Sequence, residues 1–284
     1  MNNMRHDREF VYTDKDFLFL SQLVTSHAGI SLPDGKKQLL YSRLTRRLRE
    51  LGLRSFAEYC DILNNNLDDE FPKFINAITT NVTHFFRENH HFDFLKESIL
   101  PELVKKNKTV HRPKLRIWSA GCSTGEEAYS IAIVVRETIP DIHRWDARIL
   151  ATDLDTDVLE IAKKGIYTIE KVRDIQKDRM EKWFRILKTE DGDSLFEIKN
   201  NIRDMVAYRQ LNLMSKWPMS GRFDVIFCRN VTIYFDKETR IGLINRFADI
   251  LTSDGYLILG HSESLYGITK RFTFLGKNMH KKIR

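Results

Sequence analysis

The spacing of apolar residues divides the chain into two parts with different periods. Between residues 13 and 80, apolar positions recur every three or four residues, as on one face of an amphipathic helix. The clearest stripe consists of Leu40, Leu44, Leu48 and Leu51. After residue 113, short apolar runs alternate with helical segments, which is typical of a parallel sheet covered by helices on both faces. The pattern predicts an α/β protein preceded by an all-helical domain over residues 13–80.

Four helices are expected in the first domain, and several of their ends carry recognisable signals. Gly29 is suited to the C-terminal cap of the first helix, and Pro33 opens the second, which reaches Gly52. Two capping boxes are expected, Thr13 with Asp16 and Ser55 with Glu58. The expected helices cover residues 14–27, 33–52, 56–64 and 68–79.

The second part, residues 113–284, alternates strands with helices and contains one interruption. Between about residues 166 and 205 the alternation breaks; a helix is expected over 178–187, and Asp191-Gly192 is a hairpin turn signal. We predict a small antiparallel insertion there, within a Rossmann-like sheet. The expected strands cover 115–119, 147–152, 206–210, 223–228 and 256–259, with a terminal hairpin over 272–274 and 279–283. The expected helices cover 89–106, 125–138, 155–164 and 236–251.

A loop of small residues joins the first of these strands to its helix and is the main chemical signal. Gly121 and Gly125 are four apart, so the dinucleotide pattern G-x-G-x-x-G is absent. Glu126 and Glu127 at the helix start would repel a pyrophosphate but tolerate a cation. Asp153, after the next strand, is placed to accept hydrogen bonds from ribose hydroxyls. A cation with a ribose and no phosphate describes S-adenosylmethionine; a structural turn in an unrelated α/β protein is the alternative.

The segment over residues 79–89 is unusual for a linker, because it carries small polar residues followed by two phenylalanines and an arginine. We interpret it as folded back over the cofactor pocket, so that residues 81–112, linker and helix, contribute to that pocket. His84, His90 and His91 suggest a metal, but no carboxylate or cysteine completes a ligand set. We therefore expect no metal, and the last two histidines on a helix surface.

Composition and charge indicate the kind of partner and the compartment of the protein. The net charge of +7 over 284 residues indicates an anionic partner, either nucleic acid or an acidic protein surface. No apolar run approaches the roughly 20 residues of a membrane span, and the first ten residues lack the apolar core of a signal peptide. Three widely spaced cysteines fit a reduced compartment, without disulfides or a metal pattern. The cysteines are Cys60, Cys122 and Cys228. We expect a cytoplasmic protein.

The second helix carries a strip of basic side chains beside its apolar stripe, with Arg49 further round the helix. Only Glu50 within that helix could pair with these arginines at a helical spacing. The strip is therefore either a solvated face or a docking surface for an acidic helix or a phosphate backbone. Its members are Lys36, Arg43, Arg46 and Arg47.

In this order of parts the chain resembles the chemotaxis receptor methyltransferases, the CheR family. Together with the basic second helix, the stretches that carry the likeness cover nearly the whole chain. They are residues 76–88 (NAITTNVTHFFRE), 118–130 (WSAGCSTGEEAYS), 151–155 (ATDLD), 223–235 (FDVIFCRNVTIYF) and 260–264 (GHSES). The resemblance implies an enzyme that transfers a methyl group from S-adenosylmethionine to glutamate side chains on the cytoplasmic helices of chemoreceptors, leaving S-adenosylhomocysteine.

The resemblance also implies roles for individual residues. Tyr234 would sit beside the transferred methyl, and Arg87 would orient carboxylate oxygens, either the substrate's or the methionyl tail's. Because a glutamate carboxylate is already ionised near neutral pH, no general base is needed and catalysis comes mostly from positioning. The residues expected to line the cofactor site are Asn81, Thr83, Arg87, Glu127, Asp153, Asn212, Leu213, Arg229 and Asn230, together with Gly121 of the glycine loop.

One departure from the family concerns the inserted hairpin. Members that dock on a receptor's tail peptide carry a Gly-x-Gly element there, whereas residues 189–193 contain one glycine and three acids. We therefore expect a monomer that docks directly on the receptor helical bundle through its helical domain, without the tether and without membrane insertion.

Two other functions share the predicted fold. A nucleic-acid methyltransferase should show a base-stacking motif of the Pro-Pro-Tyr type after the fourth strand, where this chain has 229–232, RNVT. A non-catalytic scaffold should have an emptied cofactor site, yet Gly121, Glu127, Asp153 and Asn230 are all present. Neither is preferred to the protein methyltransferase.

Overall fold

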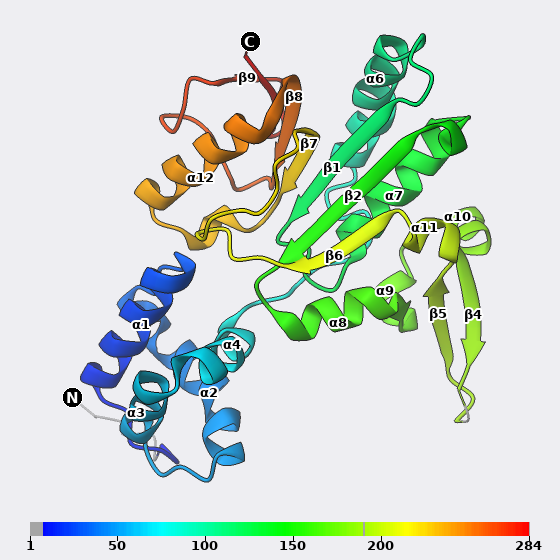
Figure 1. Cartoon of the computed structure of the whole chain (residues 1–284). Helices are drawn as coiled ribbons and strands as arrows, with labels where there is room; N and C mark the ends of the chain where they lie inside the picture. Colours follow the sequence, from blue (N-terminus) through cyan, green and yellow to red (C-terminus); the bar gives the residue numbers. More distant parts are fainter. Residues whose placement is uncertain (1–7, 190, 284) are drawn as a thin grey trace. The chain divides into compact units, whose positions relative to one another are not determined.

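A computed structural model describes residues 8–189 and 191–283, and the chain separates into two compact units (Figure 1). The first unit contains the described chain up to Thr80 together with Tyr234–Asp236. The second contains the rest of the described chain, beginning at Asn81. The segment that follows Thr80 is thus part of the second unit rather than a separate linker.

Four α-helices form the first unit, as the apolar periodicity predicted. At the start of α1 both hydrogen bonds of the predicted capping box are present, between Thr13 and Asp16, and Gly29 caps its end with a φ of 71°. A 3-10 turn at Asp34–Lys36 precedes α2. The helices are α1 (Asp14–Ala28), α2 (Lys37–Glu50), α3 (Phe56–Asn65) and α4 (Leu67–Ile78).

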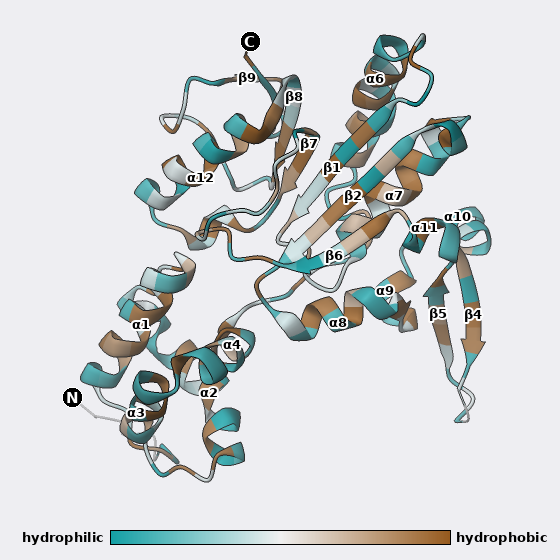
Figure 2. Ribbon diagram, viewed as in Figure 1, coloured by the Kyte–Doolittle hydropathy of each residue, from teal (hydrophilic) through white to brown (hydrophobic). Residues whose placement is uncertain are grey.

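The core of this unit is the apolar stripe of α2 packed on aromatic side chains. Leu40, Leu44 and Leu48 are buried as predicted, while Leu51 at the helix end is only partly buried. Along these helices, brown hydrophobic residues alternate with teal hydrophilic ones in Figure 2, as expected of amphipathic helices. Aromatic side chains that share this core are Tyr12, Phe56, Tyr59 and Phe74.

The second unit is built on a seven-stranded sheet with the order β6-β2-β1-β7-β8-β10-β9. The five strands from β6 to β8 are parallel, and the terminal hairpin adds β10 and β9 antiparallel to them. The mostly parallel Rossmann-like sheet is therefore confirmed. The strands are β1 (Lys114–Ala120), β2 (Asp146–Asp153), β6 (Val206–Gln210), β7 (Phe223–Cys228), β8 (Leu251–Leu259), β9 (Phe272–Phe274) and β10 (Met279–Lys282).

Helices cover the sheet because its strands are apolar on both faces. Helices α7 and α8 pack against β2 and β6, and α12 packs against β8. The Trp118 ring of β1 contacts Phe247 of α12, with centroids 5.3 Å apart. The helices are α5 (His90–Phe94), continued by a π-helical turn (Leu95–Ile99) into α6 (Leu100–Lys106), then α7 (Glu126–Thr138), α8 (Thr156–Lys164) and α12 (Lys237–Ile250).

The predicted antiparallel insertion is present as a separate three-stranded sheet, β3-β5-β4. Its hairpin pairs Phe184 with Ile198, both buried. The helix predicted over 178–187 ends at Trp183, so that prediction was wrong beyond this residue; cross-strand pairing of its apolar residues overrode their helical spacing. The elements are β3 (Ile166–Tyr167), α9 (Ile169–Val172), α10 (Lys177–Trp183), β4 (Phe184–Lys188), β5 (Ser194–Ile198) and α11 (Asn200–Arg203).

Glu190 of the hairpin turn lies outside the described residues, as do the first seven residues of the chain. Among the helices of the described chain, none has the length and apolar character that crossing a membrane requires.

Candidate active site

The glycine loop after β1 lies against the end of β2 and against the loop after β7. Gly121 and Cys122 donate their backbone N–H groups to the carbonyl oxygen of Thr152, at 2.8 and 2.9 Å. Gly121 has a φ of 83°, and a Cβ added there would lie 2.3 Å from Cγ2 of Val231. Glycine is therefore required at position 121 for both backbone conformation and space.

Asp153 ends β2 beside this loop, as predicted. Its Oδ2 accepts the backbone N–H of Ser123 at 2.8 Å, and its Oδ1 accepts that of Asp155 at 3.1 Å. Burial raises the pKa of Asp153, and these two hydrogen bonds offset only part of that effect. Each carboxylate oxygen can accept a further hydrogen bond, which suits it to a ligand hydroxyl.

Glu127, in the first turn of α7, is a second carboxylate whose charge is only partly compensated. Its Oε1 accepts the Ser119 hydroxyl at 2.7 Å, and its Oε2 lies 3.2 Å from Nη1 of Arg229. Burial raises the pKa of Glu127, while the charge of Arg229 and the hydrogen bond from Ser119 act in the opposite direction. A cationic ligand would supply the compensation that is missing.

Arg229, directly after β7, has a side chain only 2% exposed and joins several site segments. Besides Glu127, it lies 3.5 Å from a carboxylate oxygen of Glu88 and donates to the carbonyl oxygen of Arg87. Its Nε is buried and has no hydrogen-bond partner among the described residues. The structure thus brings Arg229 to Glu127, whereas Glu88 had not been predicted as a site residue.

The segment after Thr80 folds against the glycine loop. Asn81 donates its side-chain amide to Asp155 at 2.7 Å, and its carbonyl oxygen accepts the hydroxyl of Ser123 at 3.3 Å. The carbonyl oxygen of Thr83 accepts Nζ of Lys171 at 3.2 Å. The segment thus lies beside the glycine loop, and its contribution to a cofactor pocket remains a prediction.

Arg87 is partly buried in the same segment. One of its guanidinium nitrogens, Nη1, donates to the carbonyl oxygen of Val82 at 2.7 Å. Its backbone carbonyl, rather than its side chain, contacts Arg229. The proposed role of the Arg87 side chain in orienting a carboxylate remains a prediction.

Asn212 and Leu213 follow β6, the neighbour of β2. The N–H of Leu211 donates to the carbonyl oxygen of Asp153 at 2.9 Å, which places this turn beside the end of β2. The side-chain oxygen of Asn212 accepts the N–H of Met214 at 2.9 Å, and Leu213 is buried. The segment therefore lies beside the end of β2, and its place in the cofactor site remains a prediction.

The loop after β7 contains Asn230 in a left-handed conformation, with a φ of 58°. Its N–H donates to Oε2 of Glu263 at 2.7 Å. Sequence reasoning had singled out residues 260–264 without assigning Glu263 a role. The available signal was its position just past the end of β8, the neighbour of β7, where parallel-sheet proteins place their functional groups.

Tyr234 is grouped with the helical unit, and its side chain is 39% exposed. Its backbone carbonyl oxygen accepts the N–H of Ser31 at 2.8 Å. Its role beside the transferred methyl remains a prediction from the motif.

The basic strip of α2 differs from the predicted ladder of unpaired arginines. Arg47 forms a two-bond ion pair with Glu70 of α4, at 2.8 and 2.7 Å, and Arg43 donates to the carbonyl oxygen of Ile78. The prediction of unpaired arginines was wrong for these two, because their partners come from another helix and not from a helical spacing within α2. Lys36 and Arg46 are exposed.

The expectation that His91 lies on a helix surface was also wrong, since its side chain is fully buried. Burial lowers its pKa to about 4, and its Nε2 lies 2.8 Å from the carbonyl oxygen of Lys277. Glu88, His90 and His91 bring potential ligand atoms within 4.8 Å of one another, so a carboxylate does accompany the histidines. That carboxylate is already engaged by Arg229 and His261, and we assign no metal to it.

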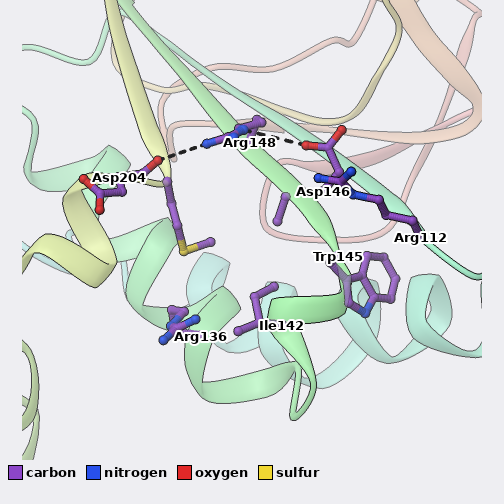
Figure 3. A pocket seen from close by; sticks show the side chains of 9 residues that line it. Arg112, Arg136, Ile142, Trp145, Asp146, Arg148 and Asp204 are labelled. Carbon is purple, nitrogen blue, oxygen red and sulfur yellow. Dashed lines mark hydrogen bonds and ion pairs between the residues drawn. The ribbon is translucent and has the colours of Figure 1, made fainter.

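A separate hollow of about 210 Å³ lies at the opposite end of the strands, where β2 begins (Figure 3). Arg148 projects over it, 3.7 Å from Asp146, and donates to the carbonyl oxygen of Asp204 at 3.2 Å. Ligands of parallel α/β sheets bind at the carboxyl ends of the strands, so this hollow is not the cofactor site. Its other labelled lining residues are Arg112, Arg136, Ile142 and Trp145.

Comparisons with known proteins agree with this arrangement of parts. Residues 81–280 match the family described as CheR methyltransferase, SAM binding domain, and residues 15–79 match the CheR methyltransferase all-alpha domain. The match to this S-adenosylmethionine-binding domain confirms the predicted cofactor.

Several curated relatives match over most of both chains. A probable chemotaxis protein methyltransferase of Rhizobium etli is 41% identical over 87% of this chain and 92% of its own. Chemotaxis protein methyltransferases of Borreliella burgdorferi and Escherichia coli are 40% and 39% identical, over 93% and 94% of this chain and 92% and 91% of theirs. The chain belongs to the CheR methyltransferase family, with an N-terminal all-helical domain and an S-adenosylmethionine-binding domain.

Proposed function

We propose that this protein transfers a methyl group from S-adenosylmethionine to glutamate side chains of chemoreceptor cytoplasmic domains, forming methyl esters. The observation that carries the proposal is a pair of partly buried carboxylates, Glu127 and Asp153, on either side of the glycine loop, whose pKa values are raised because their charge is under-compensated. They suit a cofactor that combines positive charge with a ribose. The relatives' names, chemotaxis protein methyltransferase, support the substrate class.

We assign cofactor binding to residues from five segments. Asp153 is suited to accept ribose hydroxyls, and Glu127 to face the positive charge of the methionyl part. Asn81 and Thr83 border the site from the segment after the helical domain. Asn212, Leu213, Arg229 and Asn230 border it from the ends of β6 and β7, with Gly121 allowing close backbone approach.

The reaction requires little acid–base catalysis from the protein. The substrate carboxylate is the nucleophile and needs no general base near neutral pH, while the bound cofactor supplies an activated methyl group. Arg87 and Tyr234 are proposed to orient the attacking carboxylate beside that methyl. Because attack neutralises both reactants, water exclusion favours the transition state over the separated charges.

Receptor recognition is proposed to use the helical unit directly. Lys36 and Arg46 are the exposed members of the basic strip, and the Arg46 side chain is 88% exposed despite its pair with Glu50. Arg43 and Arg47 instead hold α2 to the end and the start of α4. Such a strip suits an acidic face of a receptor helical bundle in the cytoplasm. We propose a monomer acting without a tail-peptide tether, since the β4–β5 turn has a single glycine.

The test is incubation with methyl-labelled S-adenosylmethionine and purified receptor cytoplasmic fragments, with RNA as the competing substrate. We expect base-labile label on the receptor fragment, which is the signature of a carboxyl methyl ester. Asp153→Ala protein serves as the matched control for cofactor-dependent transfer. Base-stable label on RNA would support a nucleic-acid methyltransferase, and cofactor binding without any transfer would support a scaffold; either result would overturn the proposal.

A further inference from the structure

The loop after β7 is held by one carboxylate from the loop after β8. Glu263 accepts the N–H groups of three successive residues: Asn230 at 2.7 Å, Val231 at 3.0 Å and Thr232 at 2.6 Å. It also accepts the Thr232 hydroxyl at 2.9 Å and the N–H of Gly260 at 2.7 Å. Five donors thus converge on a side chain that is 1% exposed.

This arrangement is a backbone anion site filled by the chain itself. Successive N–H groups point to one side when a turn includes a left-handed residue, and Asn230 has a φ of 58°. Hydrogen bonds to a carboxylate are about twice as strong as those between neutral groups. Asparagine tolerates the left-handed conformation better than most residues, and the hydrogen bonds to Glu263 hold the loop in it.

The same loop is pressed against the glycine loop that the cofactor must approach. Cγ2 of Val231 occupies the space in which a Cβ on Gly121 would lie, 2.3 Å from that position. Arg229, next to Asn230, reaches Glu127 at 3.2 Å. The position of this loop therefore determines how Val231 packs against the glycine loop and where Arg229 meets Glu127.

Gly260 keeps the Glu263 carboxylate in contact with the loop. A Cβ at Gly260 would lie 2.8 Å from Oε2 of Glu263 and 2.9 Å from the backbone nitrogen of Asn230. Such distances are shorter than van der Waals contact, so a side chain there would push the carboxylate and the loop apart. The glycine and the glutamate of this stretch thus act on the same loop.

We propose that Glu263 is a positioning residue of the cofactor site: it fixes the loop over Arg229–Thr232 in the conformation that binds S-adenosylmethionine. Because Glu263 is 1% exposed and its carboxylate already accepts five hydrogen bonds, it would act through the loop and not by touching the cofactor. The inference rests on the assignment of Arg229 and Asn230 to the cofactor site, and extends it to a residue that the motif alone did not explain.

The test compares the Kd of S-adenosylhomocysteine, measured calorimetrically, in Glu263→Gln, Glu263→Asp and Glu137→Gln. Glutamine directs an NH₂ or a single carbonyl at several N–H donors, so we expect a Kd about 10- to 100-fold higher. Aspartate retains the charge with a shorter reach and should recover part of the affinity. Glu137, near the C-terminal end of α7, accepts four hydrogen bonds, three from Arg179 and one from Trp183. Its variant therefore controls for the loss of a partly buried hydrogen-bond network.

The outcomes separate this inference from the site assignment. If Asn230→Ala weakens binding while Glu263→Gln binds like wild type, the positioning role is overturned although the site assignment holds. If neither variant weakens binding, both are overturned. Should the Glu263 variants fail to fold, Gly260→Ala tests the same contact, because its Cβ would push the Glu263 carboxylate away from the loop without removing the charge. We expect its Kd to rise several-fold, and an unchanged Kd would contradict the proposal.

Discussion

Two arginines, one in each unit, form ion pairs with largely buried glutamates and yet leave those glutamates in opposite electrostatic states. In the helical unit, Nε and Nη2 of Arg47 each bond one oxygen of Glu70, and the Tyr59 hydroxyl donates to the same carboxylate at 3.1 Å. Burial alone would raise the pKa of Glu70, but these hydrogen bonds and the charge of Arg47 bring it below its ordinary value.

Arg229 in the second unit makes a looser set of contacts. Only Nη1 bonds Glu127, its Nε has no partner among the described residues, and the pKa of Glu127 is raised. The Arg47–Glu70 pair, whose hydrogen bonds are all made within the fold, stabilises the structure. The Arg229–Glu127 pair leaves part of the charge of Glu127 uncompensated and can still bond a ligand. The cofactor site can be distinguished from structural ion pairs by this property.

The largest expected effect is on folding, from Arg47→Ala. Removing Arg47 leaves the buried Glu70 carboxylate with only the Tyr59 hydroxyl and the more distant Lys73, so the free energy of unfolding should fall by about 3 kcal/mol. The Kd of S-adenosylhomocysteine should stay within experimental error of wild type. Urea unfolding measures the stability, and calorimetry measures the affinity. A weakened cofactor affinity in the folded variant would contradict the purely structural role of the Arg47–Glu70 pair.

The next effect is on binding, from Asp153→Ala. We expect cofactor affinity to weaken by ~1–3 kcal/mol, because hydrogen bonds to a charged acceptor are lost. The free energy of unfolding should fall less than in Arg47→Ala, since the substitution also removes a charge that burial disfavours. Calorimetry that finds an unchanged Kd would remove Asp153 from the site.

Cofactor affinity and folding should respond to acid in different ways. The pKa values of Glu127 and Asp153 are raised, so protonation competes with cofactor binding as the pH falls towards them, at a pH above their ordinary values of 4.5 and 3.8. The same protonation relieves a destabilising charge in the unliganded protein. Glu70 acts oppositely: its lowered pKa stabilises the fold above 4.5, and that stability is lost as the pH falls through the folded-state value.

A calorimetric titration series with S-adenosylhomocysteine, from about pH 8 to about pH 5, checks this difference. Affinity should decline on acidification, with proton release on binding, and the decline should be smaller in Glu127→Gln. An affinity that stays constant over the series in the wild type, or declines equally in the variant, would show that these carboxylates do not face the cofactor.

The smallest effect is expected from Arg46→Ala, the exposed counterpart of Arg47. Stability should change by less than about 0.5 kcal/mol, as for exposed ion pairs generally. If the strip docks an acidic receptor face, the KM for receptor fragments should rise several-fold at low salt, and the difference should shrink as salt is added. Equal KM values for the wild type and Arg46→Ala at low salt would show that Arg46 is an ordinary solvated residue without a role in docking.

The sequence by itself determined the elements and most of the residues that meet at the strand ends. Apolar periodicity predicted the four helices and the parallel strands, since each buries a face whose spacing is local. The glycine loop and Asp153 were recognisable because a strand followed by a turn delivers its polar residues to one edge of the sheet.

Tertiary structure alone decided which charges are compensated. No helical spacing could show that Glu70 pairs with Arg47, that five donors surround Glu263, or that His91 is buried. Nor could it show that residues 184–188 pair as a strand. In water, the free energy of a charged side chain depends little on its neighbours. In a buried site, it depends on a few partners that come from distant parts of the chain.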